Sequence, residues 1–111
     1  MELVHLPAEK IDYLTGNKYH GVVSFLGALN CVLDLAAVIK KIDTLLLPGG
    51  FFIVSMLNKF CLWEFIYFAV TKNNLPLATR RWKRNPVTVK LTPAGPSIAV
   101  CYYTPGQFIR L

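Results

Sequence analysis

Apolar residues recur every three or four positions between Asp34 and Leu46, while the polar residues among them face elsewhere. This period is typical of an amphipathic helix, and Asp34 stands where the first N–H groups need an acceptor. Pro48-Gly49-Gly50 then predicts a chain reversal, because proline cannot continue a helix and glycine adopts positive φ freely. The run 51–57 is apolar on both faces apart from Ser55, as in a parallel strand covered on both sides.

Another strand, 19–26, is expected before this helix. Strand, helix and strand in this order predict a parallel β-α-β unit with a right-handed crossover. Nearer the N-terminus, 3–6 fits a brief strand, and apolar spacing of three across 7–14 predicts one or two helical turns. Because open α/β sheets bind ligands beyond the carboxyl ends of their strands, Asn58 marks a candidate site.

The last third of the chain changes character after an apolar helix expected at 60–70 and a short basic helix at 78–84. Segments 86–91 and 97–103 alternate with period two around a Pro/Gly loop, which predicts an antiparallel hairpin. Thr104-Pro105 has the pattern of a helix N-cap followed by proline at the first helical position. The expected fold class is α/β, with a mostly parallel sheet that ends in a C-terminal antiparallel hairpin.

The 111 residues fit one domain, 1–111, with a modest core. Hydrophobic residues make up 54% and charged residues 16%, against a usual charged share of roughly a quarter. Much of this chain is therefore expected to be covered by itself, by a partner or by lipid.

A net charge of +6 owes much to a basic cluster, which consists of Arg80, Arg81, Lys83 and Arg84 around Trp82. Cations with an embedded aromatic side chain can bind phosphates and stack bases. No nucleic-acid motif accompanies them, so a solvated helix end is the favoured interpretation and nucleic-acid binding is not expected.

Three cysteines, Cys31, Cys61 and Cys101, lie far apart among apolar neighbours. They fit buried free thiols in a reducing compartment, and we expect a cytoplasmic protein without a secretory signal. His5 and His20 share no metal-ligand spacing, so no metal site is expected.

Residues 51–70 have the length of a membrane span and a positive flank. Asn58, Lys59 and Glu64 fall near the middle of this stretch, where each charge would cost a few kcal/mol. The break in the apolar run favours a strand, a loop and a helix, so a membrane protein is not expected.

Together these elements resemble the second half of a Rossmann-like (class I) S-adenosylmethionine-dependent methyltransferase domain. Tyr19–Phe25 is similar to the fourth strand of that family, and 27–35 is similar to the segment after it. Leu45–Gly50 matches the Leu-Leu-x-Pro-Gly-Gly turn before the fifth strand and is the most specific motif. Asn58–Glu64 resembles a bacterial subset in which a Phe-Cys-x-Trp-Glu run opens the substrate-side helix.

The resemblance implies S-adenosylmethionine as cofactor, bound at the carboxyl ends of the strands. It places Ala8 and Glu9 near adenine, and Ser24 and Phe25 beside the methionine end. It also implies that the methyl acceptor, an unidentified small molecule, faces Asn58, Phe60 and Trp63. Such enzymes act largely by holding a methyl group in line with a nucleophile in a dry pocket, so no catalytic residue is assigned.

Several features of the family have no counterpart in this sequence. The chain contains no G-x-G-x-G run, and Pro7 and His20 stand where many members carry aspartate. We therefore expect it to represent the C-terminal portion of such a domain and to be inactive alone.

The resemblance leaves 19–25 as an open apolar strand edge, and such edges recruit other strands. We expect a homo-oligomer through the edge Tyr19–Phe25, or pairing of that edge with segment 3–6. The alternative function is a non-enzymatic interaction module that self-associates or binds nucleic acid through its basic cluster.

Overall fold

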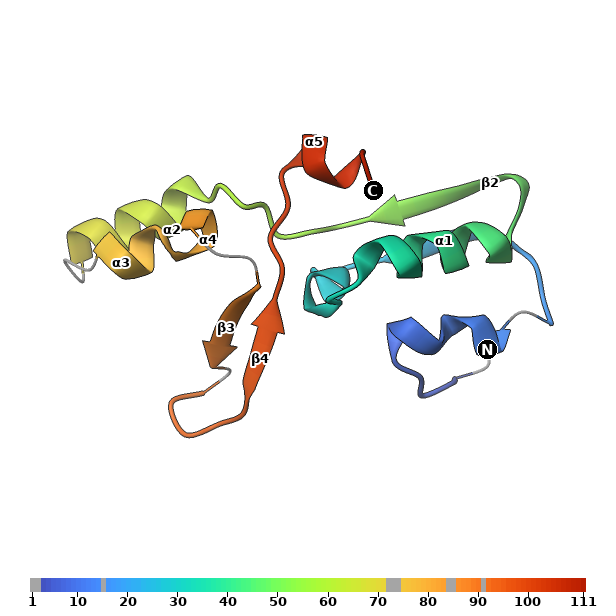
Figure 1. Cartoon of the computed structure of the whole chain (residues 1–111), viewed down its shortest axis with the longest axis horizontal. Helices are drawn as coiled ribbons and strands as arrows, with labels where there is room; N and C mark the ends of the chain where they lie inside the picture. The colour runs from blue at the N-terminus through green and yellow to red at the C-terminus, as the bar shows by residue number, and fades with distance from the viewer. Residues whose placement is uncertain (1–2, 15, 72–74, 84–85, 91) are drawn as a thin grey trace.

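A parallel β-α-β unit forms the centre of the molecule in the computed structural model (Figure 1). Strands β1 (Tyr19–Ser24) and β2 (Leu46–Val54) pair in parallel, and α1 (Leu35–Leu45) connects them. The strand-helix-strand order predicted from the sequence is confirmed. The structure describes residues 3–14, 16–71, 75–83, 86–90 and 92–111.

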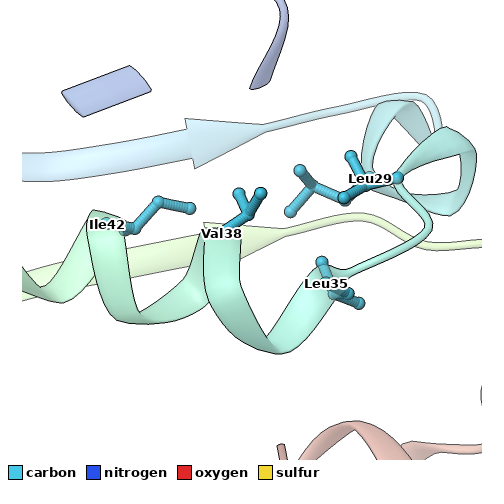
Figure 2. Packing of buried hydrophobic residues seen from close by; sticks show 5 residues of the cluster. Leu29, Leu35, Val38 and Ile42 are labelled. Atoms are coloured by element: carbon cyan, nitrogen blue, oxygen red, sulfur yellow. The ribbon is translucent and has the colours of Figure 1, made fainter. Parts of the chain in front are cut away.

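Helix α1 begins at the cap that the sequence predicts. The Asp34 carboxylate accepts a hydrogen bond from the N–H of Ala37 at 3.0 Å. The apolar stripe of the helix is buried and consists of Leu35, Val38, Ile42 and Leu45. Figure 2 shows Val38 and Ile42 in the space between α1 and the strands, together with Leu29 from η2 (Ala28–Cys31). This packing fixes one face of the sheet against α1.

The Pro-Gly-Gly sequence lies inside the bounds of β2 and not before it. Tyr19 pairs with Leu46, and Gly21 pairs with Phe51. Between these two pairs β2 therefore contains more residues than β1 does. The extra residues form a bulge in which Gly49 has φ of 80°, a conformation that glycine adopts without strain. The predicted turn is therefore present as an irregularity at the start of β2.

Strands β3 (Val87–Lys90) and β4 (Ser97–Val100) form the predicted antiparallel hairpin. Leu91, the expected end of the first strand, lies outside the described residues. The hairpin is a two-stranded sheet of its own, so the prediction that it ends the parallel sheet was wrong. After β4 the chain contacts the β-α-β unit through Cys101, whose N–H donates to the Asn30 carbonyl, and through a bridge between Tyr103 and Asn58.

Four short helices follow β2 and cluster at one end of the molecule (Figure 1). They are α2 (Leu62–Ile66), the π-helical η3 (Tyr67–Thr71), α3 (Leu75–Ala78) and α4 (Arg80–Lys83). The helix expected at 60–70 is confirmed by α2 and η3, and the basic helix expected at 78–84 is confirmed by α4 in its described part, whereas α3 begins earlier than expected. No helix among the described residues is long and apolar enough to cross a membrane.

The two ends of the chain differ in how well local sequence predicts them. The 3-10 helix η1 (Ala8–Leu14) packs against α1, and α5 (Pro105–Phe108) begins at the predicted Thr104 cap. Segment 3–6 has no regular secondary structure, so the expected strand there, and its pairing with β1, were wrong. Its side chains are exposed except for the half-buried Leu6, so burial does little to hold it extended.

The molecule as a whole is open. Its radius of gyration is 16.5 Å, whereas about 13 Å is expected for a compact chain of this length. Helix α1 covers one face of the parallel sheet, while Phe51 and Ile53 on the other face remain half exposed.

Candidate functional site

A pocket of about 240 Å³ lies where β2 ends and α5 begins. Figure 1 shows α5 beside the carboxyl end of β2. We call this hollow the α5 pocket. Its lining combines apolar walls with three neutral polar side chains and consists of Val54, Met56, Asn58, Tyr103, Thr104, Pro105 and Phe108.

Asn58 reaches the pocket because β2 continues into a segment that pairs with the chain after β4. The N–H of Lys59 donates to the carbonyl of Tyr103 at 3.1 Å. The side-chain oxygen of Asn58 accepts from the N–H of Phe60 at 3.2 Å. This Asx turn fixes the Asn58 amide at the pocket and directs the chain toward α2.

Thr104 forms the opposite wall through a capping box. Its hydroxyl accepts from the N–H of Gln107 at 3.2 Å, and its own N–H donates to Oε1 of Gln107 at 3.0 Å. The reciprocal bonds satisfy two N–H groups at the start of α5 and hold Thr104 and Pro105 in place. This wall of the pocket is therefore preorganised.

The Tyr103 phenol is the most perturbed ionisable group of the pocket. Burial raises its pKa, and the neighbouring Cys101 and Asp34 side chains raise it further because they disfavour a second negative charge. The phenol therefore stays neutral at physiological pH. The described lining contains no Asp, Glu, Lys or Arg, so the pocket can orient a small ligand but offers no acid-base pair.

The four residues expected to contact the cofactor do not join this pocket. Ala8 packs against the core, and Glu9 is exposed on η1 with its carbonyl bound to Lys41 Nζ. The Ser24 carbonyl accepts from Ser55 N–H at 2.8 Å, while the Phe25 side chain is 63% exposed. S-adenosylmethionine needs an enclosed adenine slot and an acceptor for its ribose hydroxyls. These residues supply neither, so they do not fit the cofactor on their own.

The three residues expected to face the acceptor are also separated. Only Asn58 lines the α5 pocket. Phe60 lies 5.9 Å from the Trp82 ring, and Trp63 lines a different hollow beside Glu64 and Arg80. The structure thus brings one of the seven predicted site residues to the pocket, and it adds Tyr103 and Thr104.

Arg80 and Arg81 of the basic cluster turn inward instead of toward solvent. Arg80 binds Glu64 with its Nη2 at 2.9 Å, and Arg81 binds the other carboxylate oxygen of Glu64. Arg81 also lies over the Tyr102 ring at 4.3 Å. Trp82 stacks on Phe65 at 5.1 Å. The expectation of a solvated helix end was wrong for both arginines. Arg84 and the Lys83 side chain lie outside the described part of the chain.

Sequence reasoning overlooked Asn30, which is fully buried. Its Nδ2 donates to the carbonyls of Leu57 at 3.1 Å and Cys101 at 2.6 Å, and its Oδ1 accepts from Leu57 N–H at 2.8 Å. Asn30 thereby ties the segments after β2 and β4 to η2 and positions the strand end that carries Asn58. An asparagine inside the apolar run 28–33 is the one signal that could have indicated it.

All three cysteines are free, as expected from the sequence. Cys101 is buried and Cys61 is half-buried, whereas Cys31 is exposed, so the expectation that all three are buried was wrong. Within the described residues, no cluster of His, Cys, Asp and Glu could hold a metal ion.

Comparisons of this chain with protein-family models, with curated proteins and with solved structures found no match.

Proposed function

We propose that this chain forms the acceptor side of a Rossmann-like S-adenosylmethionine-dependent methyltransferase and that the α5 pocket receives the methyl acceptor. The observation that carries the proposal is the position of Asn58, Tyr103 and Thr104 at the carboxyl end of a strand in a parallel β-α-β unit. Open α/β sheets bind their ligands at such ends. The resemblance of Leu45–Gly50 to the family turn supports the same assignment.

The lining suits the positioning of a small neutral acceptor. The Asn58 amide and the Tyr103 and Thr104 hydroxyls can orient polar atoms, while Val54 and Phe108 exclude water from one side. Orientation of reacting groups supplies much of the rate enhancement in group transfer. Because Ala8, Glu9, Ser24 and Phe25 form no cofactor slot, we expect no methyl transfer by this chain alone.

Two-dimensional NMR titration with S-adenosylhomocysteine tests this assignment. We expect weak binding in the millimolar range, with amide shifts at Ser24, Phe25 and Asn58, which mark the carboxyl ends of β1 and β2. Asn58→Ala should reduce the shifts, whereas Asn17→Ala, in an exposed turn, should not. Shifts that avoid both strand ends, or that persist in Asn58→Ala, would contradict the proposal.

We propose a reducing compartment such as the cytoplasm for this protein. The free thiols of Cys31, Cys61 and Cys101 support it, because an exposed thiol such as Cys31 persists only where disulfide formation is disfavoured. Thiol labelling of the protein in intact cells should modify Cys31, and a mixed disulfide at that position would contradict this placement.

A second candidate is a non-enzymatic interaction module. The half-exposed face of the parallel sheet supports its self-associating form. The nucleic-acid form has less support, because Arg80 and Arg81 are bound to Glu64. Salt-dependent binding to single-stranded nucleic acid that is lost in an Arg81→Ala variant would restore it.

A further inference from the structure

The face of the β1–β2 sheet opposite α1 is apolar and uncovered. Its exposed side chains are Val23, Phe25, Phe51 and Ile53, with exposed fractions of 47%, 63%, 54% and 51%. We call this surface the bare face. Val23 pairs with Ile53 and Gly21 pairs with Phe51, so Val23, Phe51 and Ile53 form one continuous patch across both strands, and Phe25 follows directly after β1.

Gly21 makes the patch flat. A Cβ at this position would lie 2.3 Å from the Phe51 ring, which shows that the ring rests directly on the β1 backbone. Neither β1 nor the segment 51–54 carries Asp, Glu, Lys or Arg. The bare face lacks the charges and prolines that commonly keep sheet surfaces and edges apart.

The turn after β1 adds a strained apolar side chain next to this patch. Leu26 has φ of 58° and is 96% exposed. The left-handed conformation costs a non-glycine residue about 1–2 kcal/mol. The turn therefore holds the Leu26 side chain in water, next in the chain to Phe25, while backbone hydrogen bonds from Gly27 and Ala28 hold the turn in place.

The chain exposes more surface than a compact monomer of its mass. Its accessible surface measures 8150 Å², whereas a compact monomer of 12.5 kDa exposes about 6,200 Å². A standard interface buries about 800 Å² on each partner. This excess is spread over the whole open molecule, and the bare face contributes one part of it.

We propose that a second copy of this chain packs its bare face against this one, so that two sheets form a sandwich. Parallel sheets in proteins are covered on both faces, and α1 covers only one face here. An uncharged, flat apolar patch is complementary to itself, as a two-fold interface requires, and it offers no counter-charge to an ionic partner. Two such sheets pack about 10 Å apart.

Packing of the bare faces differs from pairing at the strand edge Tyr19–Phe25, which the sequence led us to expect. Edge pairing would leave Phe51 and Ile53 in water, whereas face packing removes them from it. The inference goes beyond the methyltransferase assignment, because none of these side chains lines the α5 pocket.

Analytical ultracentrifugation of the whole chain tests the proposal. We expect a dimer for the wild type and a monomer for Ile53→Lys, with a dissociation constant raised at least a hundredfold. Ile109→Lys is the matched control, because Ile109 is an isoleucine 82% exposed outside the bare face, and it should leave the dimer intact. Circular dichroism checks that both variants fold.

Val23→Thr keeps a β-branched side chain and is the second test variant if Ile53→Lys does not fold. It should weaken the dimer about tenfold, because it places a hydroxyl in the interface. Hydrogen exchange separates the two geometries, since edge pairing protects additional β1 amides and face packing does not. A monomeric wild type, unchanged association in both variants, or protection confined to the β1 edge would overturn the proposal.

Discussion

At the scale of single residues, Asn30 determines how the two sheets are joined. Its fully buried side chain makes three hydrogen bonds to backbone groups of Leu57 and Cys101. The Cys101 N–H also donates to the Asn30 carbonyl at 2.6 Å. These bonds substitute for the strand ladder that would otherwise join the hairpin to the β-α-β unit.

Asn30→Ala should lower the free energy of unfolding by about 3 kcal/mol, because it leaves the buried Cys101 carbonyl and two partly buried backbone groups of Leu57 without their side-chain partner. Asn30→Asp should also destabilise, since it replaces the Nδ2 donor with a charge facing two carbonyls. Urea unfolding measures both changes. Asn17→Ala, an exposed control, should stay within about 0.5 kcal/mol of the wild type. Equal stabilities of the Asn30 and Asn17 variants would contradict the role given to Asn30.

The Asp12–Lys41 ion pair gives a prediction for acid conditions. The hydrogen bond from Lys41 Nζ, at 2.8 Å, lowers the pKa of the Asp12 carboxyl below its ordinary value. A carboxyl group whose pKa is lower in the folded state than in the unfolded state stabilises the folded protein at pH values above the unfolded pKa. This stabilisation is lost as the pH falls through the folded-state pKa, which lies below about pH 4. An NMR titration should find the Asp12 midpoint below its ordinary value, and Lys41→Met should raise it. An unchanged midpoint in Lys41→Met would show that the pair does not form in solution.

At the scale of elements, the sequence predicted what local chemistry determines. Asp34 and Thr104 cap helices because the side-chain oxygen and the N–H that it accepts lie three residues apart. The hairpin 87–100 followed from alternation around a Pro/Gly loop. In each case the relevant partners are close in sequence.

The sequence could not predict contacts between distant segments. Asn30 meets Cys101 across 71 positions, and Tyr103 reaches the pocket only because the chain after β4 returns to β2. Arg80 meets Glu64 across 16 positions, which no helical or strand period indicates. Six of the seven expected site residues were named from the resemblance alone, and these six lie away from the α5 pocket because their neighbours in space are set by such contacts.

Glu64 joins α2 to α4 and allows a test of the helical cluster. Its side chain is 15% exposed and binds both Arg80 and Arg81. Glu64→Gln should lower the free energy of unfolding by about 2 kcal/mol, because it leaves two partly buried guanidinium groups without a counter-charge. Glu9→Gln, on exposed η1, is the matched control and should change little. Urea unfolding followed by Trp82 fluorescence measures both, since Trp82 stacks within this cluster. A similar loss in both variants would contradict the assignment.

At the scale of the whole molecule, exposed surface connects folding with association. The unfolded chain exposes about 18,000 Å² of surface. One folded copy still exposes 8150 Å², so its folding buries about one-sixth less surface than the folding of a compact monomer of the same mass would. The urea m-value scales with the surface exposed on unfolding, so a monomer should have an m-value lower by that fraction.

Packing of two bare faces should raise the m-value and link unfolding to concentration. Binding of a second copy stabilises the folded state by mass action, so the urea midpoint of the wild type should increase with protein concentration. Ile53→Lys should have a low m-value and a midpoint independent of concentration. Ile109→Lys, with its substitution outside the bare face, should behave like the wild type. A low m-value with a constant midpoint in all three proteins would show that the sheet remains uncovered in solution and that an apolar face of this size is stable in water without a second copy.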